Sequence, residues 1–85
     1  MYFGRFSSAR LDALLSVIWQ RNLTMSYIKI GDVLTLQEHS REALEQYQKA
    51  LEIVTALVAK YPKSDEWAAL AESLKAKIKT LQSKP

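Results

Sequence analysis

Few side chains in this 85-residue sequence have the type and spacing that catalysis or metal binding requires. His39 is the only histidine, its one acidic neighbour is Glu38, and the chain has no cysteine. Because a protein metal site needs several converging ligands, this pair does not predict one. The lack of cysteine also excludes disulfides and thiol catalysis. We therefore expect no metal.

The other polar residues do not form a catalytic group either. Ser7 and Ser8 have no partner base of the kind that activates a serine nucleophile. Glu45, Lys49 and Glu52 have the spacing of surface ion pairs on a helix rather than of paired catalytic carboxylates. Two isolated glycines cannot build a phosphate-binding loop. We expect no catalytic residues and no cofactor, and we predict that the chain is not an enzyme.

The composition predicts one small helical domain. Hydrophobic residues make up 48% of the chain and charged residues 25%, which is typical of a globular protein. Two Gly and two Pro are too few for the turns of an all-β fold. Arg5 and Arg10 interrupt the place of a signal-peptide core, and no uncharged apolar run approaches a membrane span. We therefore expect a cytoplasmic chain with no membrane partner.

The net charge of +3 comes from the two ends of the chain. The nearest approach to a basic cluster is formed by Lys75, Lys77, Lys79 and Lys84. At about 100° per residue, the first three fan around a helix instead of lining one face. This favours a solvated C-terminal helix. Nucleic-acid binding is a distant alternative, and it predicts strong salt dependence.

Apolar periodicity predicts three helices, at about residues 8–37, 41–61 and 65–82, after a flexible tail at residues 1–7. The first is either one helix or two with a bend near residue 18. Within it, the apolar residues that recur at steps of three or four, the helical period, are Leu11, Leu15, Trp19, Leu23, Tyr27, Ile30 and Leu34. Ser7 or Ser8, then Ser40, and then Ser64 or Asp65 are candidate N-caps. Pro62 ends the second helix.

The second and third helices differ in how much of their surface is apolar. The second has an apolar arc of roughly 160°, wider than the stripe of a helix that packs on one side only. We therefore expect it to have neighbours on two sides. The third has a single apolar face, made of Trp67, Leu70, Ala71, Leu74, Ile78 and Leu81.

The middle of the chain resembles a tetratricopeptide repeat (TPR). The matching residues are Tyr27, Ile30, Gly31, Leu34, Ala43, Tyr47 and Ala50. Gly31 and Ala43 are small where paired helices approach, and Tyr47 fills the seam between them. The run from Trp19 to Leu34, with Glu66-Trp67 after Pro62, is more similar to a long-helix bacterial variety of TPR. Trp19 and Trp67 are 48 residues apart, against about 34 in the ordinary repeat.

The sequence departs from the TPR pattern at several points. Thr55 stands where an ordinary repeat has its closing proline, and the turn at 37–40 lacks the usual glycine. Lys75 and Lys79 stand where Tyr27 and Gly31 would recur. The resemblance thus implies an antiparallel helix hairpin with a C-terminal capping helix, a fragment of a right-handed solenoid. The second helix is also similar to that of the microtubule-interacting-and-trafficking domain, which binds helical peptides in a groove.

The TPR resemblance implies a protein or peptide partner bound by one face of the first helix. The expected lining residues are Met25, Ile28, Lys29, Asp32, Thr35 and Leu36, with Lys29 selecting an acidic group. The alternative is a self-assembling element in which a second copy of the chain covers this face.

A turn near residue 39 places residue 61 opposite residue 17, so residues 8–18 overhang the hairpin. The overhang is too apolar to face water, and we assign self-association in a homodimer to Leu11, Leu14, Leu15 and Ile18. In the alternative, residues 1–18 bend back over the first helix and complete a monomeric bundle.

Overall fold

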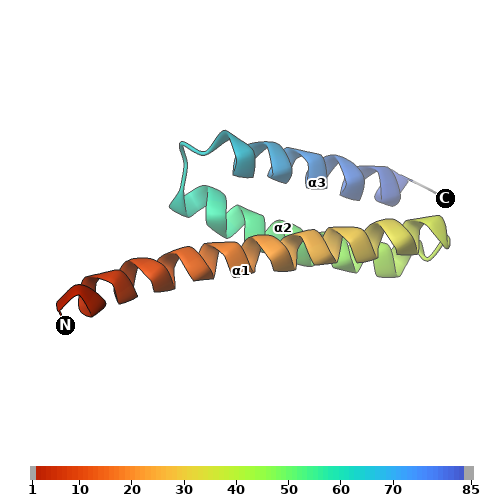
Figure 1. Cartoon of the computed structure of the whole chain (residues 1–85). Coiled ribbons are helices and arrows are strands. Elements are labelled where there is room, and N and C mark those ends of the chain that lie inside the picture. The colour runs from red at the N-terminus through yellow and green to blue at the C-terminus, as the bar shows by residue number, and fades with distance from the viewer. Residues whose placement is uncertain (1, 84–85) are drawn as a thin grey trace.

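The middle helix organises the fold, because both other helices pack on it. The computed structural model describes residues 2–83 and contains α1 (Tyr2–Leu36), α2 (Ser40–Lys60) and α3 (Asp65–Ser83), which run alternately up and down (Figure 1). Within these residues α1 and α3 each pack on α2, and no backbone contact joins α1 to α3. The predictions of an all-α, three-helix fold and of a middle helix with two neighbours are confirmed.

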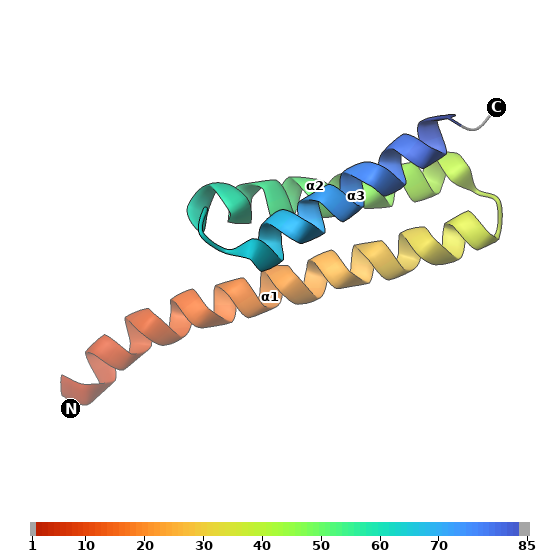
Figure 2. The ribbon, with the colours of Figure 1, turned by 90° about the horizontal axis from the view of Figure 1, so that it is seen from above.

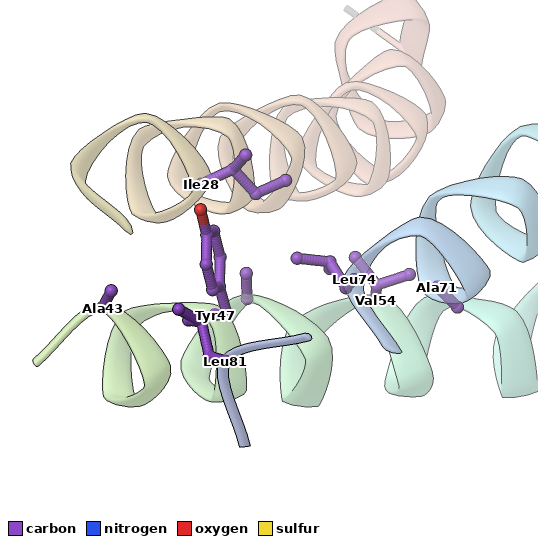
Figure 3. Close-up of a cluster of buried hydrophobic side chains, with 8 residues drawn as sticks. Ile28, Ala43, Tyr47, Val54, Ala71, Leu74 and Leu81 are labelled. Carbon is purple, nitrogen blue, oxygen red and sulfur yellow. The ribbon is translucent and has the colours of Figure 1, made fainter. Parts of the chain in front are cut away.

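The α1–α2 seam is built around one aromatic ring and three small residues. Ala43 and Ala50 are fully buried on α2, and Tyr47 between them directs its ring toward α1 (Figure 3). A Cβ added to Gly31 of α1 would lie 2.6 Å from Cε1 of Tyr47, closer than real Cβ contacts. The helices can approach this closely only because Gly31 has no side chain, as the sequence predicted.

Helix α3 buries the apolar face that the sequence predicted for it. Trp67, Ala71, Leu74 and Leu81 are buried, and Leu74 packs in the same core cluster as Val54 of α2 (Figure 3). The remaining side of α3 is largely exposed. The core is therefore two seams that share α2.

The starts of α1 and α2 differ from the expected ones. Helix α1 begins at Tyr2, so residues 2–7 of the expected tail are helical, while Met1 lies outside the described residues. Ser7 and Ser8 are inside this helix and do not cap it. The N-cap of α2 is His39 rather than Ser40, and its side chain makes no capping hydrogen bond.

The turn between α1 and α2 explains how the chain reverses without glycine. Glu38 adopts a left-handed backbone conformation, with φ of 62°. The N–H of His39 donates to the carbonyl of Leu34 (2.8 Å), and the N–H of Glu38 donates to that of Thr35 (3.0 Å). This is a Schellman motif with glutamate at the position that usually has glycine. The conformation costs about 1–2 kcal/mol for a residue with a Cβ.

The N-terminal part of α1 projects beyond the end of α2 (Figure 2). The molecule is elongated, 60 × 24 × 13 Å, and residues 11–16 are all exposed. The predicted overhang is thus present over the part whose side chains are described. The alternative in which residues 1–18 fold back is wrong, because residues 2–36 form one helix without a break.

Candidate interaction surfaces

A groove lies between α1 and α3, with α2 as its floor. Two ion pairs bridge its walls: Arg21 Nη2 lies 3.1 Å from Glu66 Oε1, and Lys77 Nζ lies 3.1 Å from Asp32 Oδ1. Both pairs join residues 45 positions apart, so the two helices run parallel in constant register. The groove has a volume of about 540 Å³. It is lined by Asp32, Thr35, Leu36, Tyr47, Ser73, Ala76, Lys77, Thr80 and Leu81.

A polar cluster in this groove joins all three helices. The hydroxyl of Tyr47 on α2 donates to the carboxylate of Asp32 on α1, and Lys77 of α3 donates to the same oxygen at 3.1 Å. The hydroxyl of Thr35 lies 3.4 Å from that of Tyr47. The Lys77 ammonium also lies 5.6 Å from the centroid of the Tyr47 ring, within cation–π range. The cluster fixes α1 relative to α3 without direct backbone contact.

The cluster is not suited to proton transfer near neutral pH. The hydrogen bond from Tyr47 lowers the pKa of Asp32, and Lys77 lowers it further, against the opposing effect of partial burial. Burial raises the pKa of Tyr47, and the bond to Asp32 reinforces this because an ionised phenol would face a carboxylate. The carboxyl group is therefore ionised and the phenol neutral, as a structural contact requires.

Three of the six predicted partner-binding residues line the groove: Asp32, Thr35 and Leu36. Met25 and Lys29 are exposed on α1 but do not line it. Ile28 is 9% exposed and belongs to the core cluster with Tyr47 (Figure 3), so its assignment to an accessible binding face was wrong. The TPR resemblance predicted a binding face on α1, but one edge of that face, which includes Ile28, is covered by packing on α2.

Sequence reasoning missed the α3 wall of the groove. Ser73, Ala76 and Thr80 recur at steps of three and four, which indicates a stripe of short side chains beside the apolar face of α3. Short residues on a helix have no binding chemistry of their own. The stripe becomes part of a groove only because α3 lies beside α1.

The second candidate surface is the overhang stripe, defined as Leu11, Leu14, Leu15, Ile18 and Trp19. Their exposed fractions are 53%, 60%, 52%, 52% and 64%, respectively. The sequence placed Leu11 and Leu15 in the overhang, and they are exposed there; Trp19 and Ile30, from the same row of apolar residues at helical spacing, are also exposed. Because α1 is apolar nearly all round, one such row does not identify the side facing α2.

The two tryptophans occupy opposite environments. Trp19 is 64% exposed, whereas Trp67 is 7% exposed and packs on α2. Their separation of 48 residues also differs from the 45-residue register of α1 and α3. They are therefore not equivalent positions of a repeat in this structure.

The other polar residues considered as candidate sites form ion pairs or lie exposed in a turn. Lys77 pairs with Asp32, and Lys75 lies 3.3 Å from Glu72, while Lys84 of the basic cluster lies outside the described residues. His39 is an exposed turn residue. Among residues 11–83, whose side chains are described, no three His, Cys, Asp or Glu side chains gather as metal ligands would. No helix within residues 2–83 is both long enough and apolar enough to cross a membrane.

Comparison with known proteins found no family model, no curated protein and no solved structure that matches this chain.

Proposed function

We propose that this chain is a non-catalytic protein–protein interaction module that binds a helix or peptide of another protein in the groove between α1 and α3. The observation that carries the proposal is the groove itself. Its walls are held parallel on α2 by the Asp32–Tyr47–Lys77 cluster, yet the two backbones do not touch within the described residues. Two resemblances support it: that to TPR implies a partner bound by one face of the first helix, and that to the microtubule-interacting-and-trafficking domain implies a helical peptide bound in a groove.

The side chains of the groove suit an amphipathic helix. Leu36, 85% exposed, offers an apolar anchor on one wall. Ala76 and Thr80 on the other wall are short, so a ligand helix can approach closely. Lys77 is about two-fifths exposed and can attract an acidic residue at the rim, a role the sequence assigned to Lys29. The proposed location is the cytoplasm, which the absence of cysteine favours.

The test is selection of peptides from a displayed random library against the immobilised chain. We expect enriched peptides with apolar residues at i, i+3 or i+4, and i+7. Ala76→Arg fills the groove and should weaken their binding at least about tenfold. Ala68→Arg is the matched control, because Ala68 is exposed on α3 but does not line the groove. Peptides that bind equally well to both variants, or a lack of enrichment, would contradict the proposal.

A further inference from the structure

The overhang stripe has the apolar spacing of a helix face that packs in a core, but no other part of the chain that the structure describes packs against it. Its five residues follow the i, i+3, i+4, i+7, i+8 spacing of a packed amphipathic helix. Each is more than half exposed, and the only charged residue between positions 11 and 19 is Asp12. At about 100° per residue, the stripe faces away from the side of α1 that Thr24 and Gly31 bury against α2. A neighbouring helix can therefore reach it without meeting α2.

We propose that this stripe pairs with the same stripe of a second copy, with the two α1 helices antiparallel around a two-fold axis between residues 14 and 15. The spacing of the stripe carries the choice of occupant. Leu11 and Ile18 lie equally far from that axis, and Leu14 and Leu15 flank it. Antiparallel pairing therefore puts Leu11 against Ile18 of the other copy and Leu14 against Leu15 of the other copy, while the two copies of each central leucine lie only about 1.5 Å apart along the helices. The surface is self-complementary, as a two-fold interface requires.

The area available reaches the lower limit of what a specific dimer needs. The exposed parts of four aliphatic side chains and one tryptophan amount to roughly 500 Å² in one copy. Two copies therefore bury roughly 1,000 Å², the lower limit for a specific interface. The helix backbone continues to Tyr2, so the paired helices can remain side by side from residue 4 to residue 25. This surface is separate from the groove, so the inference does not depend on the proposed function.

Sedimentation equilibrium of the full chain at high micromolar concentration tests the pairing. We expect a mass near twice the 9.7 kDa of one chain. Leu14→Glu places two carboxylates against each other at the axis and should give a monomer of unchanged helix content. Ser16→Glu is the matched control: Ser16 is exposed in the same segment but off the stripe, and this variant should remain dimeric. A monomeric native chain, or a dimer that withstands Leu14→Glu, would overturn the inference.

Single cysteines test the direction and register, because the chain has none of its own. Leu15→Cys should form an intermolecular disulfide on mild oxidation, since its two copies meet beside the axis. Ile18→Cys should not, because its two copies lie about 10 Å apart along the helices, beyond disulfide reach. A mixture of Leu11→Cys and Ile18→Cys chains should cross-link to each other. Self-cross-linking of Ile18→Cys as efficient as that of Leu15→Cys would indicate parallel helices and overturn the inference.

Discussion

The overhang of α1 and helix α3 have the same kind of apolar stripe but opposite environments. In α3 the stripe packs on α2, where Leu74 is fully buried and Trp67 is 7% exposed. In the overhang the side chains of the stripe are exposed to solvent, and Trp19 is 64% exposed. The difference is one of direction as well as length, because the overhang stripe faces away from the side of α1 that packs on α2, and α1 has 35 residues whereas α2 has 21. An apolar stripe shows that a helix has a face to bury, whereas the direction of that face and the length of the neighbouring helices decide whether the chain itself can bury it.

The largest expected effect separates the two tryptophans. Trp67→Ala removes a buried side chain from the α2–α3 seam and should lower the free energy of unfolding by about 3–5 kcal/mol. Trp19→Ala should change it by no more than about 0.5 kcal/mol at a concentration where the chain is monomeric. Urea denaturation followed by circular dichroism measures both.

Fluorescence quenching gives an independent check of the same contrast. In the Trp19→Phe variant the remaining Trp67 should be shielded from acrylamide, and in Trp67→Phe the remaining Trp19 should be accessible. Equal losses of stability in the two alanine variants would show that the overhang is packed in the monomer.

A smaller effect tests the close approach of α1 and α2. Gly31→Ala would place a Cβ 2.6 Å from Tyr47 Cε1, and the hydrogen bond to Asp32 restrains that ring. We expect a net loss of about 1–2 kcal/mol in the free energy of unfolding, because overpacking outweighs the gain of about 1 kcal/mol in helix propensity. Ser26→Ala, at an exposed position of the same helix, should instead be neutral or slightly stabilising. Thermal or urea unfolding distinguishes the two variants. A Gly31→Ala variant more stable than the native chain would contradict the close packing of Gly31 against Tyr47.

The smallest expected effect is the pH dependence of the groove cluster. The pKa of Asp32 is lowered from its ordinary value of 3.8 in the folded chain, by Tyr47 first and also by Lys77. The stabilisation from the ionised carboxylate is therefore present above about pH 4 and is lost as the pH falls through the folded pKa. The Asp32 and Lys77 side chains are 47% and 39% exposed, so screening limits the contribution to less than about 1 kcal/mol.

Unfolding of the native chain and of Asp32→Asn at pH 7 and pH 3 measures this contribution. The difference in stability between the two should be largest at pH 7 and should shrink at pH 3. Asp12→Asn is the matched control, since Asp12 lies in the overhang, away from α2 and α3. A difference that grows on acidification would mean that the cluster does not stabilise the ionised carboxylate.

Much of the fold could be predicted because it depends on local pattern. The wide apolar arc of α2 predicted its two neighbours, and the small size of Gly31 and Ala43 predicted where α1 and α2 approach. The candidate site was harder, because a lining residue is defined by the helix across from it. Asp32, Thr35 and Leu36 were found through one helix face, whereas Ser73, Ala76 and Thr80 have no signal of their own.

The amino-acid sequence by itself determined the three helices, the two-sided packing of α2 and an overhang with an apolar stripe. These follow from the periodicity, from Pro62 as the residue that ends the second helix, and from the number of residues on each side of the turn. Only the tertiary structure decided which side of α1 faces α2, and so why Ile28 is buried while Trp19 is exposed. It also decided that α3 lies beside α1 in a constant register, which creates the groove. The physical reason is that periodicity gives the direction of a face around its own helix axis, whereas the rotation of that helix against its neighbours depends on how side chains such as Tyr47 and Gly31 fit together.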